Sequence, residues 1–158
     1  MNEIKISLEE FKKKNVIYLD KIQDGFNKYP NIMLEGTEEY VNDAIRKLFK
    51  ENGIDNSYAD FYYGRLDQEA KNKVQDALNK EEIDFIESLQ LNENEIFLRL
   101  NQKLLEILLK LTGNEVLFSS FYFAKYPCIV WGNYDKKYPI FFKDKSVMKI
   151  VMEEILVK

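Results

Sequence analysis

Apolar residues recur at helical spacing through most of the first two thirds of the chain. Ser7 and Glu10 have the spacing of a capping box, and the apolar positions after them predict one helix that ends near Asn27. Thr37 is the expected cap of a second helix, which ends at Gly53 because a glycine suits the left-handed turn after a helix. These spacings predict two amphipathic helices before the middle of the chain.

The next segments carry a mixture of weak and strong helical signals. Residues 32–34 are expected to form a short extended connector between the first two helices. A third helix is predicted from Asp67, with a fourth helix or a bent extension over residues 83–89. The capping-box spacing recurs at Asn92, before a run rich in leucine. We therefore expect the most buried helix to follow Asn92 and to end near residue 112.

The pattern changes near Gly113, where strong β-formers and aromatic residues replace the helical spacing. Strands are predicted over residues 115–126, 128–133 and 138–143, with short turns between them. Pro139 lacks an amide N–H, which favours an edge position for the last of these strands. A closing helix is expected after the strands.

These elements together predict an α+β fold. The expected order is an N-terminal helical bundle of about five helices over residues 1–113, then a three-stranded antiparallel β-meander and a C-terminal helix over residues 114–158. A chain of 158 residues without an internal repeat or a low-complexity linker is expected to form a single compact domain. Hydrophobic residues at 46% and charged residues at 32% agree with a globular protein.

The composition also bears on where the protein works. The N-terminal residues mix charge with apolar side chains and lack the apolar run of a signal peptide. Charged residues interrupt the longest apolar stretch, so no membrane span is expected. Cys128 is the single cysteine and has no internal disulfide partner. We interpret this as a cytoplasmic protein.

The chain contains no histidine, which narrows the chemistry open to it. Ser-His, Cys-His and His-metal arrangements are excluded, and the usual near-neutral general base is missing. The six glycines are scattered singly, so none of the glycine-rich loops that bind phosphate is present. We predict no catalytic residue, no metal ligands and no cofactor, and we favour a non-enzymatic protein.

Aromatic residues make up 14% of the chain and supply the first candidate site residues. Residues 54–64 lack a steady period and contain Tyr58 and Tyr62, while Trp131 and Tyr134 stand near the end of a predicted hairpin. Tyrosine and tryptophan make contact surfaces with a low entropic cost. We predict that these four residues contact a partner.

Acidic residues supply the second candidate surface. The net charge is −4, and residues 81–98 contain no lysine or arginine. Glu82, Asp84 and Glu87 from this run are the predicted contact residues. Such a surface repels phosphate backbones and attracts cationic ones. We therefore expect a protein partner with a basic surface, with no direct contact to nucleic acid or a membrane.

Four functional hypotheses follow. The first is a protein-binding module, such as an immunity protein, antitoxin or inhibitor of bacterial or phage origin, that occludes a basic enzyme. The second is a histidine-free Mg²⁺-dependent enzyme that uses the carboxylates of Asp55, Asp60 and Asp67. The third is a binder of a small ligand or carbohydrate through Trp131, and the fourth is a homodimer formed through an edge strand.

Overall fold

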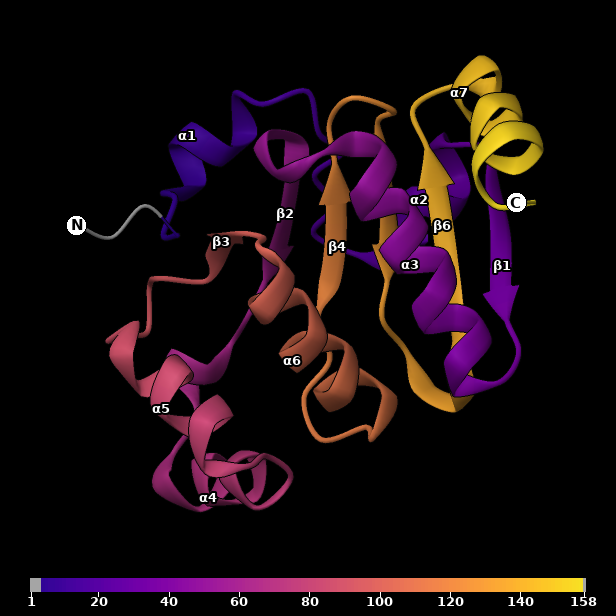
Figure 1. The fold of residues 1–158 in the computed structure, drawn as a ribbon. Helices are drawn as coiled ribbons and strands as arrows, with labels where there is room; N and C mark the ends of the chain where they lie inside the picture. Colours follow the sequence, from indigo (N-terminus) through magenta and orange to yellow (C-terminus); the bar gives the residue numbers. More distant parts are fainter. Residues whose placement is uncertain (1–3, 158) are drawn as a thin grey trace.

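The computed structural model describes residues 4–157, in which six strands form one antiparallel sheet with the order β1-β6-β5-β4-β2-β3 (Figure 1). The α+β class is confirmed. The predicted order of a helical bundle followed by a meander is wrong, because three of the strands alternate with the helices before residue 113. The strands are β1 Asn31–Glu35, β2 Ser57–Asp60, β3 Phe97–Arg99, β4 Ser120–Phe123, β5 Cys128–Trp131 and β6 Lys137–Phe142.

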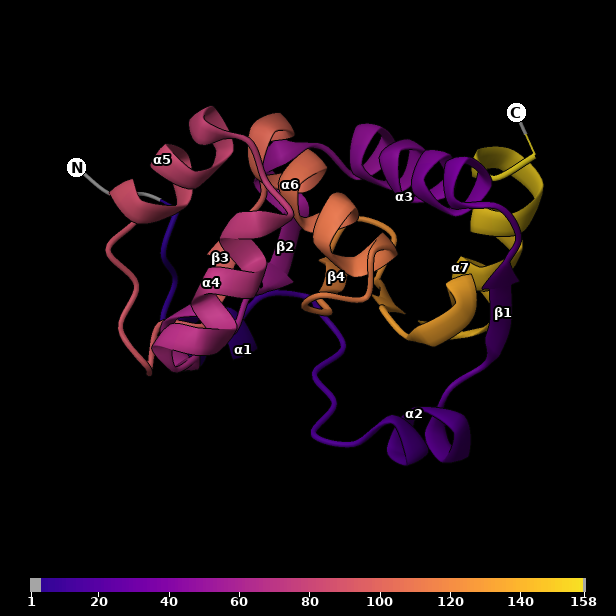
Figure 2. The same cartoon turned by 90° about the horizontal axis from the view of Figure 1, so that it is seen from below.

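Seven α-helices of the described residues cover the two faces of this sheet unequally. Helices α3, α5, α6 and α7 lie on one face, where α4 also contributes Val74 to the large core, and the short helices α1 and α2 lie on the other (Figure 2). The helices are α1 Leu8–Lys12, α2 Ile22–Lys28, α3 Glu38–Asn52, α4 Gln68–Asp76, α5 Lys80–Ser88, α6 Gln102–Gly113 and α7 Lys145–Ile150. Single turns occur at η1 Ile54–Asn56, η2 Tyr63–Arg65, η3 Tyr134–Lys136 and η4 Val151–Ile155.

Each face of the sheet has its own hydrophobic core. Phe121 and Phe123 of β4 belong to the large core under α3 and α6, whereas Tyr122 belongs to the smaller core on the side of α1 and α2. Successive side chains of a strand point to opposite faces, which places Tyr122 opposite Phe121 and Phe123. In the smaller core, the ring of Phe11 stacks on that of Phe97 with centroids 4.4 Å apart. The aromatic content therefore fills both sides of the sheet.

The predicted helix from Ser7 to Asn27 is wrong, because the chain forms two short helices with an extended segment between them. Residues 16–19 alternate between half-buried and buried positions, and Ile17 and Leu19 enter the smaller core. This period of two is the burial pattern of extended backbone rather than of a helix. The side chain of Asn15 donates a hydrogen bond to the carbonyl of Ala124 at 3.0 Å and so attaches the segment to the sheet.

Two predictions about strands also need correction. Residues 32–34 belong to the edge strand β1, and β6 lies inside the sheet because β1 pairs with it on one side and β5 on the other. Pro139 is tolerated in this interior strand because β5 pairs with β6 only from Ile140 onward. The predicted strand over residues 115–126 shortens to β4, because its first residues form a turn after α6.

The helix expected after Asn92 begins later than predicted. The amide of Asn92 donates to the carboxylate of Glu95 at 2.9 Å, but this bond closes a turn and the chain continues into β3. Phe97 and Leu98 are buried in opposite cores, which a strand achieves because successive side chains point to opposite faces. Helix α6 then starts at its cap, Asn101, whose side chain accepts from the amide of Leu104 at 2.8 Å.

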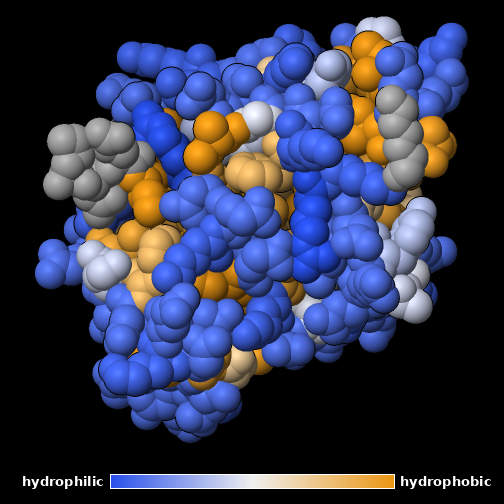
Figure 3. All heavy atoms as spheres, viewed as in Figure 1, coloured by the Kyte–Doolittle hydropathy of each residue, from blue (hydrophilic) through white to orange (hydrophobic). Residues whose placement is uncertain are grey.

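The surface over α3, α5 and α6 is mostly hydrophilic, and hydrophobic residues gather near α7 (Figure 3). Within residues 4–157 we find no helix that is long and apolar enough to cross a membrane.

Candidate functional site

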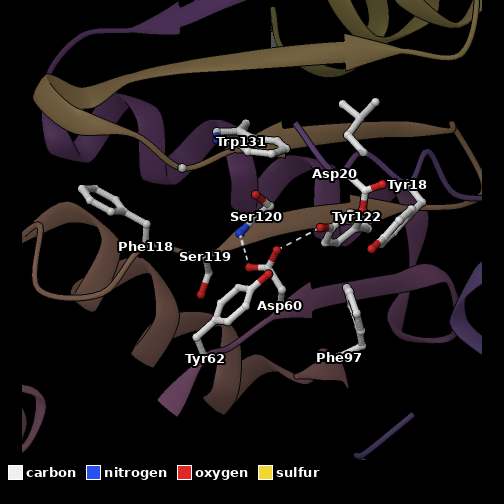
Figure 4. A pocket seen from close by; sticks show the side chains of 12 residues that line it. Tyr18, Asp20, Asp60, Tyr62, Phe97, Phe118, Ser119, Ser120, Tyr122 and Trp131 are labelled. Carbon is white, nitrogen blue, oxygen red and sulfur yellow. Dashed lines mark hydrogen bonds between the residues drawn. The ribbon is translucent and has the colours of Figure 1, made fainter. Parts of the chain in front are cut away.

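A pocket of about 240 Å³ opens where three neighbouring strands meet at one end of the sheet. Asp60 is the last residue of β2, Ser120 is the first of β4, and Trp131 is the last of β5. The extended segment between α1 and α2 closes one side with Tyr18 and Asp20 (Figure 4). The aromatic residues that line the pocket are Tyr18, Tyr62, Phe97, Phe118, Tyr122 and Trp131.

Asp60 is the buried carboxylate of this pocket, with 7% of its surface exposed. One of its oxygens accepts a hydrogen bond from the amide of Ser120 at 2.8 Å, and the other accepts from the hydroxyl of Tyr122 at 2.9 Å (Figure 4). Both donors are neutral, and Asp60 has no salt bridge to any described residue. The negative charge of Asp60 is therefore stabilised by dipoles only.

Burial has the largest effect on the pKa values of Asp60 and Tyr122. Burial raises the pKa of Asp60 to about 6, although the hydrogen bonds from Ser120 and Tyr122 act in the opposite direction. Burial and the nearby charge of Asp60 also raise the pKa of Tyr122 well above its usual value. At neutral pH the proton therefore stays on Tyr122, and Asp60 is mainly ionised.

A second carboxylate lies at the rim of the pocket. Asp20 is exposed and hydrogen-bonds the hydroxyl of Tyr18, whose pKa is raised by burial and then by this contact. No lysine or arginine is among the residues that line the pocket. Aromatic rings and carboxylates without a basic side chain form a site with negative potential, which favours a cation.

Two smaller features complete the pocket. Ser119 is 2% exposed, and its hydroxyl oxygen has no hydrogen-bond partner among the described residues. Gly132 lies against the same residue, and a Cβ at this position would come within 2.2 Å of the carbonyl oxygen of Ser119. The glycine thus allows the end of β5 to approach the segment before β4. The hydroxyl of Ser119 is itself buried, so this residue belongs to the wall behind the pocket and not to its open surface.

The four predicted aromatic residues divide between this pocket and the core. Tyr62 and Trp131, far apart in the sequence, line the pocket together. Tyr134 is 60% exposed and packs edge-to-face on Phe118, a residue of the pocket wall, with ring centroids 4.6 Å apart. Tyr58 is only 3% exposed and belongs to the smaller core, so it has little surface to offer a partner.

The predicted acidic residues lie in α5, which is on the opposite face of the sheet from α1 and α2 (Figure 2), whereas Tyr122 of the pocket belongs to the smaller core. Each has a partner within the protein. Glu82 binds the ammonium of Lys110 at 2.8 Å, and Asp84 binds that of Lys80 at 3.2 Å. Glu87 accepts a hydrogen bond from the hydroxyl of Tyr63 at 2.6 Å. The acidic and the aromatic candidates therefore do not form one continuous surface.

The carboxylates of the Mg²⁺ hypothesis are not brought together. Asp60 is held by Ser120 and Tyr122, while Asp67 caps α4 by accepting from the amide of Ala70 at 2.8 Å. In the described part of the chain, no group of three or more acidic or cysteine side chains could hold a metal ion. Cys128 is fully buried, and burial raises the pKa of its thiol, which makes it a poor nucleophile.

Sequence reasoning missed Tyr18, Asp20, Ser119 and Tyr122 as residues of the site. Tyr122 and Asp60 are 62 positions apart, and only the pairing of β2 with β4 brings them into contact. Comparison of the chain with known protein families, with curated proteins and with solved structures found no match. The function is therefore argued from the geometry of the pocket.

Proposed function

We propose that this protein is a non-enzymatic binding module that captures a partner protein with a basic surface. The observation that carries the proposal is the carboxylate of Asp60, buried among aromatic rings in a pocket whose lining contains no lysine or arginine. A cationic group of a partner would supply the charge that this pocket lacks.

The shape and size of the pocket agree with capture of a partner's side chain. A volume of about 240 Å³ is below the roughly 300 Å³ at which pockets for drug-sized ligands begin. Aromatic side chains such as Trp131 and Tyr62 are the usual anchors at protein interfaces, and Tyr134 extends the aromatic surface beyond the pocket wall. An immunity protein, antitoxin or inhibitor that occludes a basic enzyme is the form of this proposal that the overall charge of −4 favours.

Parallel capture experiments test this proposal. The wild-type protein, Asp60→Asn and the matched control Asp43→Asn are immobilised side by side and exposed to lysate of the source cells. Asp60→Asn removes the buried charge and keeps the shape, while Asp43→Asn removes an exposed charge of α3. We expect one basic protein to bind to the wild type and to Asp43→Asn in a salt-sensitive manner, and to be lost with Asp60→Asn.

Three outcomes count against the proposal. They are the capture of no protein, the capture of the same proteins by all three variants, and the capture of acidic proteins only.

A further inference from the structure

The proposed function leaves open which cationic group enters the pocket. Resting on that function, we propose that the pocket binds a guanidinium group, and that an arginine side chain of the partner supplies it. The carboxylate of Asp60 and the rings of Tyr62 and Trp131 are the parts of the pocket that would recognise this group.

The hydrogen-bonding capacity of the pocket fits a planar fork of donors. A carboxylate has about four lone-pair positions on its two oxygens, and Asp60 uses one on each oxygen for Ser120 and Tyr122, with a further contact to its own amide. Asp60 can therefore still accept from a guanidinium, which offers five N–H donors in fixed directions. A lysine ammonium has three donors and lacks this planar arrangement.

The walls favour the same group. Trp131, Tyr62 and Phe97 line the pocket, and a guanidinium can stack on aromatic rings while its edge binds a carboxylate. A guanidinium is also more weakly hydrated than an ammonium, so less free energy is lost when it leaves water for a partly buried site.

The protein carries its own reporter for this binding. Trp131 is the only tryptophan of the chain, and it lines the pocket. A cation stacked on its indole ring should change its fluorescence, so one titration reports on this pocket alone.

The test compares capped short peptides that differ in one side chain: arginine, lysine, or citrulline as the neutral isostere of arginine. We expect saturable binding of the arginine peptide at millimolar concentrations, about tenfold weaker binding of the lysine peptide, and no binding of the citrulline peptide. Methylguanidinium serves as the free cation and is expected to bind more weakly than the arginine peptide. Equal binding of the lysine and arginine peptides would overturn the assignment of a guanidinium, as would no response to any probe. Methylguanidinium that binds more tightly than the peptide would overturn the partner arginine as its source.

Three variants locate the binding. Asp60→Asn should weaken binding of the arginine peptide by at least about tenfold, because the charge is lost and the shape is kept. Tyr62→Leu should weaken it several-fold, because it removes an aromatic ring that lines the pocket. Asp43→Asn, a control that removes an exposed charge of α3, should bind like the wild type. Unchanged binding in both pocket variants contradicts the proposal, and circular dichroism confirms that each variant is folded.

The outcomes separate this inference from the function on which it rests. If a basic partner is captured through Asp60 but the arginine peptide does not bind, the guanidinium assignment fails and the proposed function stands. If the peptide binds but no basic protein is captured, the chemistry of the pocket stands and the proposed function fails.

Discussion

The two acidic regions of this protein hold their carboxylates in opposite ways. On α5, Glu82 and Asp84 have lysine partners, and Asp84 is 64% exposed. In the pocket, Asp60 is 7% exposed and has only neutral hydrogen-bond donors as partners. The charges of Glu82 and Asp84 are therefore largely neutralised by lysine, whereas the charge of Asp60 has no basic partner among the described residues.

This difference shows that a high density of acidic residues along a sequence does not by itself locate a site for a cation. Exposed carboxylates paired with lysines contribute little to binding, because water and the lysines already stabilise them. One buried carboxylate without a basic partner costs stability in the free protein, and a bound cation can recover that cost. Asp60 is therefore the better candidate for a functional role. The prediction that the acidic residues of α5 contact a partner stays untested.

The largest expected effect concerns the core that supports the pocket. Phe11 is fully buried and packs on Phe97 and Tyr122, which both line the pocket. Phe11→Ala should lower the free energy of unfolding by about 3–5 kcal/mol, because it leaves a cavity in the smaller core. Urea denaturation measures this loss. Leu8→Ala, in the same helix and 41% exposed, is the matched control and should cost much less. Equal losses in the two variants would show that α1 does not support the pocket through Phe11.

The second effect concerns the buried charge itself. Because burial raises the pKa of Asp60 from 3.8 to about 6, the native state binds more protons than the unfolded state between these values. This group therefore lowers the stability of the wild type as the pH rises through that range. Asp60→Asn avoids the cost and should be more stable than the wild type by up to about 3 kcal/mol at pH 7, with no gain below about pH 4.

Tyr122→Phe changes the other partner of this hydrogen bond and should lower the stability, whereas Asp60→Asn should raise it. It removes a donor to the ionised carboxylate, so it should destabilise the protein by about 1–3 kcal/mol at neutral pH. The loss should shrink as the pH falls and Asp60 gains a proton. Urea denaturation at several pH values measures both variants. A gain for Asp60→Asn that is the same at every pH would contradict the buried charge.

Local sequence signals predicted several helix ends correctly. Helix α3 begins after its predicted cap Thr37 and ends before Gly53, whose φ of 87° lies in the left-handed region. Of the two alternatives left open for residues 83–89, a separate fourth helix is correct, because Asn79 forms a capping box with Glu82 and starts α5 at Lys80. Such signals involve residues within one turn of each other, so they can be recognised without the rest of the fold.

The parts that depend on distant contacts were missed. The short strand β3 forms because Phe97 pairs with Asp60 of β2, 37 positions earlier in the sequence. The pocket needs the same long-range pairing, since its residues come from three strands and from the segment between α1 and α2. The aromatic composition indicated Tyr62 and Trp131 as candidates, but nothing in the sequence showed that they share a pocket. Asp60 had been considered only as a metal ligand because its burial was not visible.

The smallest expected effects on stability concern Glu82 and Asp84, two carboxylates of α5. Glu82 has a side chain that is only 15% exposed, and it accepts from Lys110 and from the amide of Asn79. Partial burial raises the pKa of Glu82, but these contacts outweigh burial and lower it on balance. Glu82→Gln should therefore cost about 1 kcal/mol at pH 7, and this cost should vanish as the pH falls below the pKa of Glu82.

Asp84→Asn removes the salt bridge to Lys80, four residues earlier, which is more exposed than that of Glu82. The free energy of unfolding should therefore fall by less than about 0.5 kcal/mol. Urea denaturation at low and high salt measures both variants, and salt should reduce the smaller effect further. If Asp84→Asn costs as much as Glu82→Gln, the exposed carboxylates of α5 are not screened as the comparison requires. The acidic residues of α5 would then again be candidates for the partner-binding surface.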